Sequence, residues 1–170
     1  MSYAPPRYFG ETGALSATFR RAEAPPDLAI GARTRVSHLA TGATTDGGFG
    51  LYRWDMAAVA PTAATPSGHY HRTFSESFYI LEGTVALYNG HTWTDATSGD
   101  FLHVPSGGIH AFANNSGGAA SMLVLFTPGA PREAYFEELA DIVATGRELT
   151  EQEWIELYAR HDQYPAGTLG

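Results

Sequence analysis

The sequence contains no cysteine, which excludes disulfide bonds, thiolate metal sites and a cysteine nucleophile. Any bound metal ion would therefore have nitrogen and oxygen ligands. Basic residues are also scarce: ten Lys and Arg stand against eighteen Asp and Glu, and the net charge is −8. This composition provides no basic patch for a phosphate backbone or an anionic membrane, so we expect neither nucleic acid nor a membrane as a partner.

Long apolar segments are missing as well. No run of about 18 apolar residues occurs, which is the length that a transmembrane helix needs. The N-terminus has neither the basic region nor the apolar region of a secretion signal. We therefore expect a soluble, cytoplasmic protein.

The residues that are abundant favour a compact all-β protein. Of the 170 residues, 44% are hydrophobic and 16% are charged, as in folded globular proteins. The 19 glycines and 10 prolines are concentrated before residue 130, where they interrupt the chain too often for long helices. The length fits one domain.

Three segments are distinguished by their patterns. Residues 1–33 are rich in proline, alanine and glycine and read as an N-terminal arm. Residues 34–128 contain short β-branched or aromatic runs bounded by turn residues, which predict about seven or eight strands. Within them Asn89 and Gly90 form a strong hairpin signal, so the strands on either side should be antiparallel.

Residues 129–170 predict a helical C-terminal segment. Apolar residues recur at helical spacing between Pro131 and Gly146, which are typical residues for the start and the end of a helix. Thr150 and Glu153 then form a capping-box pattern before a second amphipathic stretch. We find no internal repeat of 20–50 residues, which leaves a single β-barrel with a helical tail.

Four residues have the pattern of a metal site. His69 and His71 lie two residues apart, so on a strand both imidazoles point to the same face. Glu76 follows across a polar turn and starts a new strand, and His110 starts a further one after a Pro-Ser-Gly-Gly turn. If these strands line one barrel, the four side chains form a set of three nitrogen ligands and one oxygen ligand. The simpler alternative is histidines satisfied by hydrogen bonds and a surface carboxylate, but an unpaired carboxylate inside a barrel would be costly.

The spacing around these residues resembles the two signature motifs of the cupin superfamily. The first motif, Gly-X5-His-X-His-X4-Glu-X6-Gly, is matched from His69 to Gly83, with Ala63 at the position of its first glycine. The second, Gly-X5-Pro-X-Gly-X2-His-X3-Asn, is matched throughout, and the matched stretch covers about residues 67–114. The matching residues are His69, His71, Glu76, Gly83, Gly99, Pro105, Gly107, His110 and Asn114.

The resemblance implies a single jelly-roll barrel that holds one divalent transition-metal ion through His69, His71, Glu76 and His110. Fe, Mn, Ni or Co would suit these ligands, and Zn or Cu would also fit. Cupins of this size commonly pair, so the resemblance also implies a homodimer in which the arm or a β face contacts the second copy.

Among small cupins the chain is most similar to the monocupin quercetinases, which are dioxygenases. In that group the substrate's enolate binds the metal, dioxygen cleaves the ring, and the ligand glutamate takes the substrate's proton. Glu76 would then be a catalytic residue as well as a metal ligand. The expected partners are a flavonol-like or other enolisable aromatic small molecule and O2.

Two other activities remain open from the sequence. A cyclase or isomerase of the polyketide cyclase type would use the ion as a Lewis acid and would consume no oxygen. A ligand-binding cupin without turnover would use the same pocket for recognition alone. Whichever holds, the candidate pocket residues are Tyr52, Trp54, Phe78, His103 and Phe112. Aromatic residues at such positions are more often part of the core, but those at one mouth of the barrel could stack on a planar ligand, and His103 could contact the substrate or support a metal ligand.

Overall fold

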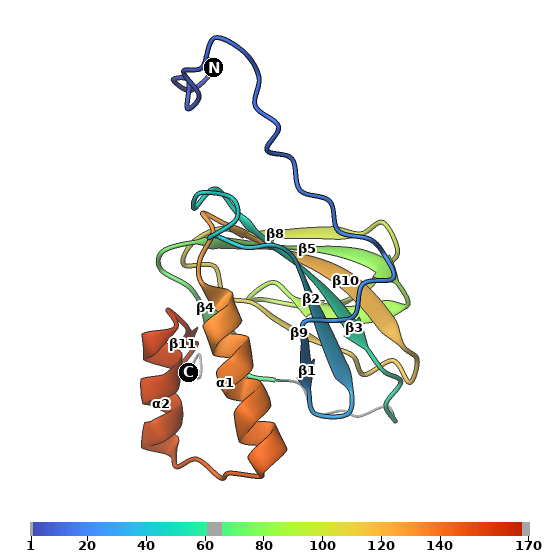
Figure 1. Ribbon diagram of the computed structural model, residues 1–170. Helices are drawn as coiled ribbons and strands as arrows, with labels where there is room; N and C mark the ends of the chain where they lie inside the picture. Colours follow the sequence, from blue (N-terminus) through green and yellow to red (C-terminus); the bar gives the residue numbers. More distant parts are fainter. Residues whose placement is uncertain (1, 61–65, 168–170) are drawn as a thin grey trace.

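The computed structural model describes residues 2–60 and 66–167, which form a β-barrel flanked by two helices (Figure 1). The larger sheet has the order β1-β2-β3-β10-β5-β8, and its neighbouring strands are all antiparallel. Its strands are β1 (Leu28–Ile30), β2 (Thr34–Ala40), β3 (Gly50–Met56), β10 (Ala120–Thr127), β5 (Ser75–Glu82) and β8 (Phe101–Val104).

Two smaller sheets complete the barrel. One has the order β7-β6-β9, with β6 (Thr84–Tyr88), β7 (Trp93–Thr97) and β9 (Ala111–Ala113). The hairpin predicted at Asn89 and Gly90 connects β6 to β7, which pair antiparallel, and Gly90 has a φ of 87°. The other sheet pairs β4 (His69–Tyr70) with β11 (Tyr164–Pro165), near the C-terminus.

The alternation of side chains along β5 explains how the core and the candidate site share one interior. Phe78 and Ile80 are fully buried, whereas Tyr79 between them is 43% exposed. Glu76 lies two residues before Phe78 and therefore also points inward, where it is 6% exposed. The predicted start of this strand and its inward face are confirmed.

Two helices pack beside the barrel. Helix α1 (Arg132–Thr145) ends at Gly146, which is left-handed with a φ of 66°, as its glycine predicts. Tyr135, Phe136 and Ile142 of α1 join the hydrophobic core of the barrel. Helix α2 (Glu151–Arg160) begins with the predicted capping box, in which Thr150 and Glu153 satisfy each other's backbone N–H groups. The all-β body with a helical tail is confirmed.

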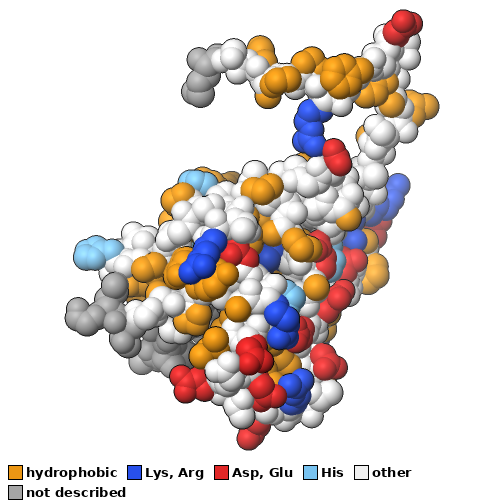
Figure 2. All heavy atoms as spheres, turned by 90° about the vertical axis from the view of Figure 1, so that its left-hand side faces the viewer, with side chains coloured by type: hydrophobic (Ala, Val, Ile, Leu, Met, Phe, Trp, Pro, Cys, Tyr) orange, Lys and Arg blue, Asp and Glu red, His pale blue; other side chains and the backbone are white. Residues whose placement is uncertain are grey.

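The N-terminal arm extends away from the barrel (Figures 1 and 2). Its apolar side chains are largely in solvent: Phe9 is 85% exposed, Leu15 110% and Phe19 84%. The segment expected to be arm, residues 1–33, includes in its last part the strand β1, which pairs with β2 at the edge of the large sheet. The described part of residues 34–128 contains nine strands, β2 to β10, where the sequence predicts about seven or eight; β4 has only two residues, and β7 has the largely polar sequence WTDAT. Within the described ranges, no helix has the length and apolar character needed to cross a membrane.

Candidate metal centre

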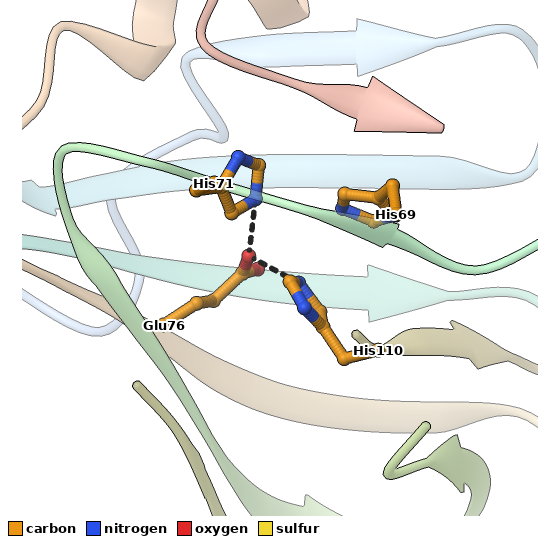
Figure 3. A group of neighbouring side chains, drawn as sticks. All are labelled: His69, His71, Glu76 and His110. Atoms are coloured by element: carbon orange, nitrogen blue, oxygen red, sulfur yellow. Dashed lines mark hydrogen bonds and ion pairs between the residues drawn. The ribbon is translucent and has the colours of Figure 1, made fainter. Parts of the chain in front are cut away.

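His69, His71, Glu76 and His110 converge on one point inside the barrel (Figure 3). One potential ligand atom from each side chain lies within 4.8 Å of the corresponding atoms of the other three. The cluster is shielded from solvent, because His71 is 2%, Glu76 6% and His110 1% exposed.

Backbone hydrogen bonds hold the histidine-bearing segments together. His69 and His110 form an isolated β-bridge in which each N–H donates to the other's carbonyl oxygen, at 3.0 and 2.9 Å. The N–H of Gly107 donates to the carbonyl oxygen of His71 at 2.7 Å, which ties the Pro-Ser-Gly-Gly turn to the first motif. The φ of Gly107 is 84°, a conformation that favours glycine. The glycine of the second motif therefore helps to place two ligands.

Carbonyl groups fix the tautomers of two histidines. Nδ1 of His71 donates to the carbonyl oxygen of Asp162 at 2.6 Å, and Nδ1 of His110 donates to that of Gly108 at 3.0 Å. Because a carbonyl oxygen can only accept, both protons reside on Nδ1 in the neutral rings. Both Nε2 atoms then point at Oε2 of Glu76, at 3.0 Å for His71 and 2.9 Å for His110 (Figure 3).

Burial and mutual charge shift the protonation equilibria of the cluster. Burial raises the pKa of Glu76, but hydrogen bonds with Nε2 of His110 and of His71, which form when a proton lies between these atoms and the carboxylate, outweigh it and hold that pKa well below its usual range. Burial opposes charge on His110, yet the hydrogen bond and charge of Glu76 raise the pKa of this imidazole above its ordinary value. Burial, and then the charge of His110, lowers the pKa of His69 to about 3, so this ring is neutral near pH 7.

The donor set fits a divalent metal ion. Lone pairs of two Nε2 atoms and a carboxylate oxygen face one another at close range, which requires a cation between them, either a proton or a metal. Three imidazoles and a carboxylate are ligands that Fe, Mn, Ni, Co, Cu and Zn all accept. Carbonyl acceptors on Nδ1 are the usual outer support for metal-bound histidine.

Comparison with known proteins agrees with this geometry. Residues 56–126 match the cupin domain family. These residues form a cupin domain. The chain is also 31% identical over 97 residues to quercetin 2,3-dioxygenase from Bacillus subtilis (strain 168), an alignment that covers 57% of this chain. It covers only 27% of the length of that relative. The resemblance to cupins of the quercetinase type is confirmed.

Two solved structures share the cupin fold with this chain. A predicted oxalate decarboxylase from Thermotoga maritima superimposes with a TM-score of 0.53 and 19% identity, covering 66% of this chain and 99% of that one. The polyketide cyclase RemF from Streptomyces resistomycificus gives a TM-score of 0.50 and 20% identity, covering 65% of this chain and 78% of that one. These likenesses support the jelly-roll fold.

A cavity of about 140 Å³ adjoins the cluster of the cupin domain. Its apolar walls come from the barrel and from α1, and the polar or charged side chains of His69, Glu76, Arg132 and Gln163 also contribute. The lining residues are Trp54, His69, Glu76, Phe112, Val124, Arg132, Tyr135, Phe136, Leu139 and Gln163. A second hollow of about 210 Å³ shares His69, Phe112 and Gln163 with it, so the two are neighbours.

The residues expected to line the substrate pocket occupy three different places. Trp54 and Phe112 line the cavity, and their rings contact each other edge to face, with centroids 5.5 Å apart. Tyr52 and Phe78 are fully buried in the core and line neither hollow.

His103 is not brought to the cluster. On β8 the partly buried Leu102 and the buried Val104 alternate with the exposed His103, which therefore lies on the outer face of the sheet. Its Nδ1 is hydrogen-bonded to the hydroxyl of Ser77 at 2.9 Å. The expected place of His103 in the pocket is corrected accordingly, because a strand carries alternate side chains to opposite faces.

Among the residues of the site that the sequence did not predict are three with charged or amide side chains. Arg132, at the start of α1, and Gln163, before β11, line the cavity, and Asp162 supports His71. None belongs to a local motif, and Asp162 is 91 residues from His71. The sequence indicates only that these residues lie in the segment after the barrel, which is expected to pack against it.

Proposed function

We propose that this cupin is a metal-dependent dioxygenase that acts on an enolisable aromatic or flavonol-like small molecule. The observation that carries the proposal is the buried set of three imidazoles and one carboxylate beside a cavity with aromatic walls. The 31% identity to quercetin 2,3-dioxygenase supports the choice of reaction class.

The chain's own residues suggest how the substrate would be handled. A divalent ion held by the cluster would act as a Lewis acid on a substrate hydroxyl and favour its ionised form. Oε2 of Glu76 is the oxygen that both His71 and His110 approach. Oε1 has no hydrogen bond within the described ranges, so this oxygen is free to take the substrate's proton.

The walls of the site favour a planar aromatic substrate. Trp54 and Phe112 line the cavity together with the apolar side chains of Val124, Phe136 and Leu139. A substrate larger than this cavity would extend past Phe112 and Gln163, which line both hollows, into the neighbouring one. Its acidic oxygen would then lie at the cluster.

Oxygen uptake with defined metals tests this proposal. The purified protein is reconstituted with Fe, Mn, Ni or Co in turn, its metal content is measured, and quercetin and other enolisable aromatics are supplied. We expect uptake that depends on both metal and substrate. A metal-loaded protein that converts an enolisable substrate without consuming oxygen would contradict the dioxygenase and favour a cyclase or isomerase, and a protein that binds no metal would contradict both.

A further inference from the structure

Arg132 is a buried cation that has no carboxylate partner within the described part of the chain. The side chain is 4% exposed, and none of the ion pairs found among residues 2–60 and 66–167 involves it. A buried unpaired charge is costly, so such a residue calls for an explanation. Four aromatic rings surround the guanidinium, with their centroids 4.2–5.6 Å from its central carbon, and their cation–π contacts offset part of this cost. The rings belong to Phe74, Phe126, Tyr135 and Phe136.

Hydrogen bonds use only part of the donor capacity of Arg132. One terminal nitrogen donates to the carbonyl oxygen of His161 at 2.7 Å, and the other donates to Oε1 of Gln163 at 3.0 Å. The Nε proton has no acceptor among the described residues. Arg132 lines the cavity beside Glu76, and the charge of Glu76 acts to raise the pKa of the guanidinium while burial lowers it.

Trp54, which lines the same cavity, carries a second unpaired donor. Its indole Nε1 is buried and has no hydrogen-bond partner within the described part of the chain. An indole N–H and a guanidinium N–H can only donate. Two residues of the cavity wall therefore carry buried donors that have no acceptor among the described residues, and a ligand rich in acceptor oxygens would satisfy both.

The charge balance of the cavity favours an anion over a neutral ligand. Glu76 is the carboxylate among the lining residues, and it already faces His71 and His110. The neighbouring carboxylates are engaged elsewhere: Glu133 accepts from the hydroxyl of Tyr52, and Asp162 accepts from the backbone of Arg72 and Thr73. A divalent ion together with Arg132 would carry more positive charge than Glu76 neutralises.

We propose that the cavity selects small aromatic anions, carboxylates or ionised phenols, and that Arg132 and Trp54 are the residues that recognise the anionic oxygens. This inference rests on the proposed function and narrows its substrate class. An arginine fork holds a carboxylate through two parallel hydrogen bonds, so Arg132 would orient the ligand as well as attract it.

Binding of benzoate and benzamide to the zinc-loaded protein tests the inference. The two probes have the same shape and differ in charge, and zinc is redox-inert, so calorimetry measures binding without oxygen chemistry. We expect benzoate to bind at least about tenfold more tightly than benzamide. Equal affinities would overturn the inference.

Variants assign the selectivity to the two donors. Arg132→Met should weaken benzoate binding about tenfold or more and leave benzamide unchanged, with zinc content equal to that of the wild type. Arg132→Lys keeps the positive charge but loses the planar fork of the guanidinium, so its affinity for benzoate should lie between that of the wild type and that of Arg132→Met. Trp54→Phe removes one donor and should weaken benzoate severalfold, and it keeps the test decisive if Arg132→Met does not fold.

Arg160→Met is the matched control, because it removes one positive charge from a side chain that pairs with Glu138 on the surface, outside the cavity. It should bind benzoate as the wild type does. If Arg132→Lys and Trp54→Phe also bind benzoate with wild-type affinity, the inference is wrong. Benzoate binding that depends on Arg132, in a protein that takes up no oxygen with any metal, would uphold the inference and refute the dioxygenase.

Discussion

The carbonyl oxygen of Asp162 accepts a 2.6 Å hydrogen bond from Nδ1 of His71, across 91 residues of sequence. The Asp162 carboxylate reinforces this contact, because it accepts from the N–H groups of Arg72 and Thr73 and from the hydroxyl of Thr73, at 2.6–3.2 Å. The tail of the protein therefore clamps the loop that carries a candidate metal ligand.

Loss of the Asp162 clamp should weaken metal binding. We expect Asp162→Ala to lower zinc affinity about 10–100-fold, the usual effect of removing the support behind a metal-bound histidine. Asp162 has a φ of 52°, and Asp162→Asn should lose less, because asparagine tolerates this conformation and keeps one acceptor oxygen. Competition with a chelator measures the affinity. Asp141→Ala, at an exposed position of α1, is the control, and an unchanged affinity in Asp162→Ala would contradict the clamp.

The ligand assignment can be tested one side chain at a time. His69→Ala and His110→Ala should abolish stoichiometric metal binding and leave the β-rich circular dichroism spectrum intact. His103→Ala should keep full metal content, because His103 is on the outer face of the sheet. Full metal occupancy in His69→Ala or in His110→Ala would show that the replaced histidine is not a metal ligand.

Glu76→Gln separates two roles of one carboxylate. If Glu76 acts as the base, this variant retains metal and loses turnover, because an amide oxygen can bind an ion but cannot accept the proton. Metal analysis and oxygen uptake on the same sample measure both roles. Full turnover in Glu76→Gln would contradict the role of Glu76 as the base.

Replacement of Gly83 should destabilise the fold more than replacement of Gly99. Both have positive φ, 74° and 94°, so alanine costs about 1–2 kcal/mol at each. A Cβ at Gly83 would also clash with the carbonyl oxygen of Ala119, whereas one at Gly99 would have no described atom within 4 Å. The melting temperature of Gly83→Ala should lie well below that of Gly99→Ala, since a loss of 1 kcal/mol in stability lowers the melting temperature of a protein of this size by about 2–4 °C. Equal melting temperatures would contradict this contact.

Alkaline pH should destabilise the protein through Tyr135. Burial raises the pKa of this phenol to about 12 from 10. The unfolded chain therefore ionises first, and the contribution of Tyr135 to stability is complete below pH 10 and is lost as the pH rises towards 12. Tyr135→Phe should lose less stability than the wild type between pH 8 and pH 11, by up to about 1 kcal/mol in urea unfolding. Tyr3→Phe, at a fully exposed position, should behave as the wild type.

The homodimer stays a prediction, and the exposed arm gives it a test. Phe9, Leu15 and Phe19 are at least 84% exposed, and burial of such side chains against a second copy would be favourable. We expect the whole chain to sediment as a dimer and a variant without residues 1–20 to dissociate at micromolar concentration. A monomeric whole chain would rule out this role for the arm.

The sequence predicts the four convergent residues because their signal is local. His69 and His71 share a strand face, and the spacing to Glu76 and the turn before His110 are fixed by short segments. The positions of Arg132 and Asp162 depend on how the tail packs against the barrel, which no short pattern encodes. For His103 the strand was predicted correctly, but its facing was decided by the pairing of β8 with β5.

During synthesis, the metal site is complete only once Asp162 has reached His71. All four candidate ligands, residues 69–110, leave the ribosome before α2 and Asp162 do, and domains fold from the N-terminus as they emerge. A nascent barrel would thus possess its donors while His71 can still adopt either tautomer. Tight and correctly oriented metal binding would become available only after Asp162 has emerged and packed against the loop that carries His71.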